Sequence, residues 1–227
     1  MSMSMNFLKP LIWCVILASC GGGKQNNQQL AHTYFKMAFS DIAEGSNPAV
    51  SLKRALVNIN KALASDNHPE YYAFKGAILF KLGDYEQSEV CYQQALACQP
   101  EAGLRAEISN NRACLLAHRK NYAQAQEVWH ALIRDTSYQT PEVAWVNLGK
   151  MYVEEKKFQD AKKAFAQAVA VAPSYVDAHF YLSIVERELG NRQHARYEAD
   201  MVLKMEPEHH GAHMLMAAID PVPHEVR

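Results

Sequence analysis

Five small side chains recur along this chain at nearly constant spacing. They stand at Ala55, Ser88, Ala125, Ala161 and Ala195, at intervals of 33 to 37 residues. Around each of them, apolar residues follow one another at intervals of three and four, which is the spacing of one face of an α-helix. One helix pair of this length buries too little apolar area to be stable alone, so the sequence predicts a stack of such pairs.

The clearest unit runs from Glu142 to Pro173 and reads as two amphipathic helices joined at Lys156 and Lys157. Gly149 and Ala161 are small where the two helices approach each other. Trp145, Tyr152 and Phe165 are large enough to fill the space around that contact, and Pro173 cannot continue a helix. These residues and their spacing resemble the tetratricopeptide repeat.

The resemblance implies an all-α fold, a right-handed superhelix of about five helix pairs with a C-terminal capping helix. In the last of these helices, Met214, Leu215 and Ile219 are expected to cover the final pair. We divide the chain into a signal peptide (1–19), a lipidated cysteine with a flexible tether (20–29), the repeat domain (30–219) and a disordered tail (220–227).

Composition and motifs argue against several functional classes. The formal net charge of −1 gives no basic excess for nucleic-acid binding. The chain has no phosphate-binding, zinc-protease or serine-hydrolase motif, so we expect neither an enzyme nor a bound cofactor or small-molecule substrate. His209 and His213 could share a helix face and are the strongest metal candidate, but a solvated helix is the favoured interpretation and we expect no metal site.

The N-terminus resembles a bacterial lipoprotein signal. A short apolar run ends in Leu17-Ala18-Ser19-Cys20, and it is too short to span a bilayer. The resemblance implies cleavage before Cys20 and lipidation of its thiol. Gly21 follows, and the resemblance then implies anchoring in the outer membrane, facing the periplasm. An ordinary signal peptide with an incidental cysteine is the alternative.

With no catalytic motif, function is expected on a surface. In stacked repeats of this kind, the first helix of each pair lines the concave side. Asn111 and Asn147 occupy the same register position, where an amide can bind a peptide backbone as both donor and acceptor. The partner-binding groove that we predict is lined by Asn111, Val143, Val146, Asn147, Lys150, Val153, Phe180 and Ile184. The alternative is that the valines pack inside the domain and that the asparagines bond local backbone.

A lipid attachment signal, a short tether and five or six repeats together resemble the type IV pilus pilotins of the PilF and PilW type. The local likeness is best at Asn110-Asn111, Tyr138, Pro141 and the run from Ala144 to Gly149, although Arg112-Ala113 replaces the Tyr-Gly that often follows the asparagines in that family. The resemblance implies an adaptor that escorts secretin subunits to the outer membrane. An adaptor for periplasmic cell-wall enzymes is the alternative function.

Overall fold

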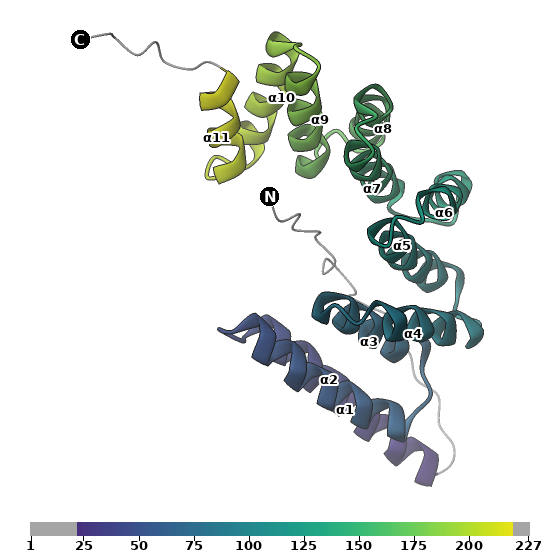
Figure 1. Cartoon of the computed structure of the whole chain (residues 1–227). Helices are drawn as coiled ribbons and strands as arrows, with labels where there is room; N and C mark the ends of the chain where they lie inside the picture. The colour runs from purple at the N-terminus through teal and green to yellow at the C-terminus, as the bar shows by residue number, and fades with distance from the viewer. Residues whose placement is uncertain (1–21, 220–227) are drawn as a thin grey trace. The chain divides into compact units, whose positions relative to one another are not determined.

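The computed structural model describes residues 22–219, and every regular element within them is an α-helix (Figure 1). The helices are α1 (Gly22–Ala43), α2 (Pro48–Ser65), α3 (Pro69–Leu82), α4 (Tyr85–Ala97), α5 (Ala102–His118), α6 (Tyr122–Arg134), α7 (Pro141–Glu154), α8 (Phe158–Val171), α9 (Val176–Glu188), α10 (Arg192–Met205) and α11 (His210–Ile219). The predicted all-α fold of five successive pairs and one further helix is confirmed for this part of the chain.

The expectations for the two ends of the chain lie partly outside this range. The predicted signal peptide (1–19), Cys20 and the predicted tail (220–227) are outside the described residues. Among the helices that are described, none combines the length and apolar character needed to cross a membrane.

Helix α1 includes most of the segment for which the sequence predicts a flexible tether. Residues 22–29 are helical and continue directly into the part of α1 that packs on α2. Extending an existing helix needs no new nucleus, and the glutamines here are good helix formers. Once Ala31 and Ala38 are buried against α2, the residues before them can therefore continue the helix.

The turn inside four of the pairs is closed in the same way. The residue at this turn has a positive φ, and the next residue donates its N–H to a carbonyl five positions earlier, as in a Schellman motif. The positive-φ residues are Gly83, Lys120, Lys156 and Gly190, with φ of 85°, 64°, 59° and 81°. The closing bonds are Asp84 to Leu79, Asn121 to Leu116, Lys157 to Tyr152 and Asn191 to Glu186, each 2.8 or 2.9 Å long.

The described chain divides into two compact units, residues 22–115 and residues 116–219. In the first unit, α1 and α2 pack through Ala31, Ala38, Ala55, Ile59 and Ala62, all fully buried. Tyr71, Phe74 and Ile78 of α3 complete this cluster. The small residues let the helices approach closely, and the aromatic rings fill the space beside them.

In the second unit, α8 packs between α7 and α9. Phe165 of α8 lies directly under Gly149 of α7, where a Cβ atom would meet the ring at 2.5 Å. The first unit has the same contact between Gly76 of α3 and Tyr92 of α4, at 2.9 Å. The predicted close approach at the small residues is thus present in both units.

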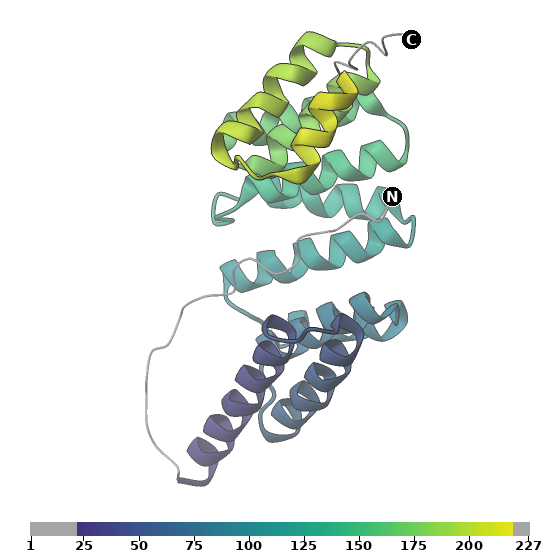
Figure 2. The ribbon, with the colours of Figure 1, turned by 90° about the vertical axis from the view of Figure 1, so that its left-hand side faces the viewer.

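Helix α11 covers the end of the second unit, against α9 and α10 (Figure 2). Leu215 and Ile219 are buried with Ala195 and Ala199 of α10, as predicted. The prediction for Met214 is wrong, because its side chain is 62% exposed. Residues 214 and 215 lie about 100° apart around the helix, and only one of them can face α10.

Candidate functional site

Five of the eight predicted partner-binding residues are on α7, and three of these, Val143, Asn147 and Lys150, lie along one side, which we call the outward face of α7. Val143 and Asn147 are half-buried and lie one turn apart, as expected. Lys150 continues the same line, but its side chain is only 7% exposed. Its ammonium nitrogen lies 4.2 Å from the ring centroid of Tyr181 on α9, a cation–π contact that closes the seam between α7 and α9.

Tyr181 is part of this seam, and sequence reasoning did not find it. Its ring stacks on Phe165 of α8 at 5.6 Å and meets Phe180 edge to face at 5.5 Å. Burial, with a smaller contribution from Asp177, raises the pKa of Tyr181 to about 12. The phenol is therefore neutral at physiological pH. Its position directly after Phe180, a predicted groove residue, was the one feature of the sequence that could have indicated Tyr181.

Glu154 is a second residue that the predicted set omitted. It is exposed at the C-terminal end of α7, four residues after Lys150. Partial burial of its carboxyl group raises the pKa of that group, whereas His118, a hydrogen bond from Tyr122, and Lys120 act to lower it. Glu154 follows Val143 by eleven residues and Asn147 by seven, which is about three turns and two turns of helix, so it lies on the same face. This face of α7 therefore presents an apolar group, an amide and a carboxyl group in succession.

Two of the predicted valines lie elsewhere. Val146 is 1% exposed and belongs to the core, together with Ala178, Leu182 and Val185 of α9. Val153 is half-buried against the same cluster. These positions on α7 point toward the first helix of the next pair, so the expectation that Val146 faces a partner is wrong. For Val146, the alternative interpretation of the sequence, in which the valines pack inside the domain, is the correct one.

Phe180 and Ile184 on α9 are half-buried because α11 covers part of them. Both pack against the buried cluster that Leu215 and Ile219 of α11 form with Ala195 and Ala199 of α10. The Phe180 ring also lies 4.8 Å from the ring of His209, and a Cβ at Gly211 would approach it to 2.8 Å. Helix α11 therefore covers part of the two residues that α9 was predicted to contribute to the partner-binding groove.

Asn111 lies in the other unit, on α5, and is half-buried. Its neighbour Arg112 forms an ion pair with Glu89 of α4 at 2.7 Å. Ile108 and Leu115 of the same helix are buried with Tyr92 and Ala95 of α4. One side of α5 is thus held against α4, while Asn111 keeps part of its surface accessible.

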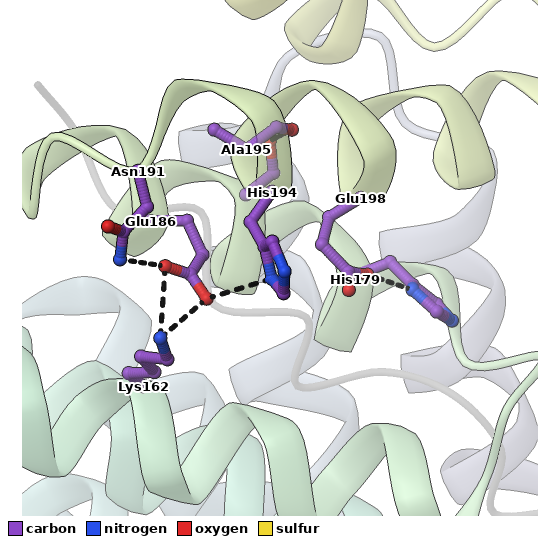
Figure 3. Close-up of polar contacts among 8 residues, drawn as sticks. Lys162, His179, Glu186, Asn191, His194, Ala195 and Glu198 are labelled. Atoms are coloured by element: carbon purple, nitrogen blue, oxygen red, sulfur yellow. Dashed lines mark hydrogen bonds and ion pairs between the residues drawn. The ribbon is translucent and has the colours of Figure 1, made fainter.

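Polar side chains near the α9–α10 turn gather around the buried carboxylate of Glu186 and form a cluster, drawn in Figure 3. Glu186 of α9 is 2% exposed, and Lys162 of α8 reaches it at 3.0 Å. The side-chain amide of Asn191 donates to it at 2.6 Å, and His194 of α10 lies 3.6 Å away. A buried carboxylate is costly unless it is paired and hydrogen-bonded, and this one is both.

The second part of the cluster joins α9 to α10 directly. His179 is 4% exposed, and its Nδ1 lies 2.6 Å from a carboxylate oxygen of Glu198 (Figure 3). Its Nε2 lies 2.9 Å from the carbonyl oxygen of Pro173, just after α8. The polar groups drawn thus connect α8, α9 and α10 to one another. We interpret the cluster as structural.

The C-terminal histidines that could have formed a metal site have other contacts. The His209 ring accepts a hydrogen bond from the backbone N–H of Ala212 at 3.0 Å, at the start of α11. The His213 ring lies 2.7 Å from the carbonyl oxygen of Pro207. Within residues 22–219, no group of three or more potential ligands is placed to hold a metal ion.

Comparison with known proteins gives one family and several solved structures. The tetratricopeptide repeat matches residues 69–102 and 146–209. The structure of pilF from Pseudomonas aeruginosa is similar, with a TM-score of 0.68 and 18% identity over 86% of this chain and 84% of that one. The crystal structure of PilW, described as a widely conserved type IV pilus biogenesis factor, has a TM-score of 0.67 and 21% identity, over 88% of this chain and 87% of that one.

The fold is also shared outside pilus proteins. MamA from Desulfovibrio magneticus RS-1 has a TM-score of 0.58 and 20% identity, over 79% of this chain and 97% of that one. The search of curated protein sequences found no match. At these sequence identities, the structural similarity establishes the fold of this chain but does not identify a binding partner.

Proposed function

Because this chain is built of tetratricopeptide repeats, we propose that it is a non-catalytic scaffold that binds a segment of a partner protein on the outward face of α7. Such repeats present the first helix of each pair to their ligands, and stacking supplies the stability of the face. The partner that we favour is a secretin subunit of a type IV pilus system, with the chain acting as a pilotin. The likeness to PilF and PilW supports this choice.

The observation that carries the proposal is the composition of the α7 face. Val143 and Asn147 are partly accessible one turn apart, and Glu154 follows at the end of the helix. An amide can both donate to and accept from a peptide backbone, and a neighbouring valine offers apolar contact to a side chain of the peptide. The Lys150–Tyr181 contact fixes the helix against α9, so the face is rigid before binding.

The proposal includes a lipid anchor on Cys20 and a position on the periplasmic side of the outer membrane. The lipobox-like run Leu17 to Cys20, with Gly21 after it, supports this part. A single acyl chain gives marginal membrane binding, whereas several give stable anchoring. The scaffold would thereby be held where an outer-membrane pore assembles.

A crosslinking pull-down from native membranes tests the binding face. We compare the wild-type chain with a Val143→Glu, Asn147→Ala variant. The matched control, Val171→Glu with Gln167→Ala, changes the same types of side chain at the same spacing on the exposed surface of α8. We expect the α7 variant to capture at least about tenfold less partner, as removal of a binding hot spot does, with thermal unfolding unchanged.

Recovery of a secretin subunit with the wild-type chain and the α8 control would support the full proposal. Equal capture by both variants would place the binding surface away from α7. Capture of cell-wall hydrolases in place of a secretin would retain the scaffold and the face, and would favour the alternative adaptor function.

A further inference from the structure

The first helix pair carries five of the nine exposed large apolar side chains of the described residues: Phe39, at the edge toward α3, and four others. Leu30 and Met37 of α1 and Val50 and Val57 of α2 are each between 45 and 54% exposed. In each helix the two residues are seven positions apart, which places them on the same face. The pair therefore has an apolar surface in addition to the face that packs on α3.

Contacts between the two helices show that these four residues share one side of the pair. Lys61 of α2 lies over the ring of Tyr34 of α1, at 5.4 Å from its centroid. Asp41 of α1 pairs with Arg54 of α2 at 3.2 Å. These two contacts form a seam along one side of the pair. On α1, Leu30 and Met37 lie next to the seam residues Tyr34 and Asp41. On α2, Val50 and Val57 lie next to the seam residues Arg54 and Lys61, so all four exposed side chains are on the side of the pair that carries the seam.

The opposite edge of α1 faces α3. The ring of Phe35 lies 5.1 Å from that of Tyr71 and 5.3 Å from that of Phe74. Phe39 approaches Phe74 at 6.2 Å. The surface bearing Leu30, Met37, Val50 and Val57, which we call the outer face, is therefore distinct from the face that joins the first pair to the second.

Basic residues border the outer face. On α2, Val50, Val57 and Ala64 follow one line along the helix, with Lys53 on one side of it and Arg54 and Lys61 on the other. Helix α2 contains these three basic residues and no acidic one. From residue 22 to residue 65 there are five basic and two acidic residues, in a chain whose net charge is −1. Apolar side chains flanked by lysine and arginine match a surface of anionic phospholipid.

We infer that the outer face of α1 and α2 lies against the anionic headgroups of the bilayer to which the chain is anchored. This inference rests on the lipid anchor of the proposed function. Cys20, its expected attachment point, precedes the first described residue of α1, Gly22, by two positions. A rigid helix that begins so close to the lipid brings the outer face to the membrane surface, and leaves the α7 face to the partner.

Methionine oxidation provides a test without any substitution. Met37 lies on the outer face at 47% exposed, and Met214 of α11 is an internal reference at 62%. The full lipidated chain is reconstituted in vesicles of equal parts phosphatidylethanolamine and phosphatidylglycerol, or of phosphatidylcholine alone. It is then treated with hydrogen peroxide and analysed by mass spectrometry. In the anionic vesicles we expect Met37 to be oxidised several-fold more slowly relative to Met214 than in phosphatidylcholine.

A variant pair checks that the residues of the outer face are responsible. Lys53→Glu with Val57→Glu should restore the oxidation rate of Met37 in anionic vesicles. Lys163→Glu with Val171→Glu, the same chemical change on the exposed surface of α8, should leave Met37 protected. Equal Met37 rates in the two lipid compositions would overturn the inference. Protection that weakens as the protein-to-lipid ratio falls would also overturn it, in favour of a second copy of the chain.

Palmitate incorporation separates this inference from the anchor. The label should be present in the wild-type chain and absent from Cys20→Ser. A labelled chain whose Met37 is unprotected would retain the anchor and refute the membrane contact. An unlabelled wild-type chain would refute the anchor, and the Met37 rates of that unlipidated chain, mixed with the two vesicle types, would then decide the contact.

Discussion

At the scale of single residues, the contact inside each pair depends on an absent or very small side chain. Gly76 and Gly149 let Tyr92 and Phe165 pack directly on the backbone of the first helix. Serine serves the same contact in another way. Ser88 of α4 donates its hydroxyl to the carbonyl of Gly76, while Ser183 of α9 donates to the carbonyl of Ala195 in α10. The two hydrogen bonds join equivalent positions of their pairs, but the serine is on the second helix in one pair and on the first helix in the other. A hydroxyl from either helix therefore fits between the two backbones.

Gly149→Leu should destabilise the second unit. A Cβ at this position already lies 2.5 Å from the Phe165 ring, so a leucine must displace the ring or separate the helices. Overpacking of this kind costs about 1–3 kcal/mol. Chemical denaturation monitored by circular dichroism measures the loss. Gly103→Leu is the control, because a Cβ there has no neighbour within 4 Å. An equal effect of the two substitutions would mean that the Gly149 contact is not specific.

At the scale of elements, the turn between the two helices is closed by a left-handed residue in four of the five pairs. Glycine adopts this conformation without steric cost, and Gly83 and Gly190 do so. Lys120 and Lys156 hold the same place with a side chain, yet the closing hydrogen bonds after them are as short as those after the glycines. The packed helices on either side therefore impose the conformation, against the local preference of lysine.

Lys156→Gly should raise stability slightly. A left-handed conformation costs a residue with a side chain about 1–2 kcal/mol, and glycine loses about 0.5–1 kcal/mol in chain entropy, so the net gain is about 0.5 kcal/mol. The denaturation midpoint measures it. Lys163→Gly, inside α8 and exposed, should instead lose about 1 kcal/mol, since glycine is a poor helix residue. A loss at both positions would show that the strain at Lys156 is negligible.

At the scale of the whole molecule, each of the two units has its own buried clusters. In the first unit they centre on α1 to α3 and on α4 with α5. In the second they centre on α7 to α9 and on α10 with α11. In repeat proteins a unit contacts mainly its neighbours, and the stability of the array is close to a sum of local terms. A local defect should therefore have a local effect.

Hydrogen exchange measured by mass spectrometry tests this locality. Gly76→Leu places a side chain within 2.9 Å of Tyr92 and should speed exchange in α3 and α4. Exchange in α9 and α10 should change little, because opening of one region need not open another. Gly149→Leu should show the converse pattern. A uniform increase along the chain in both variants would mean that the described chain unfolds as one cooperative body.

The pattern of small residues, aromatic residues and turns was sufficient to predict the helix pairs. The pairing of Gly149 with Phe165 and the turn at Lys156 and Lys157 could be inferred from neighbours in the sequence, because both depend on contacts within one pair. The helical character of residues 22–29 was missed. It follows from the packing of the rest of α1, and their own composition does not indicate it.

The sequence by itself determined the repeat, its period and the side of each helix that is apolar, since helical periodicity is a local property. Only the tertiary structure decided how deeply each residue on that side is covered. Val143 is accessible while Val146 is buried by α9, and Phe180 is partly covered by α11. The buried pair of His179 with Glu198, and the ion pair of Lys162 with the buried Glu186, likewise join residues of different helices. Burial depends on the neighbouring helix, which periodicity alone does not specify.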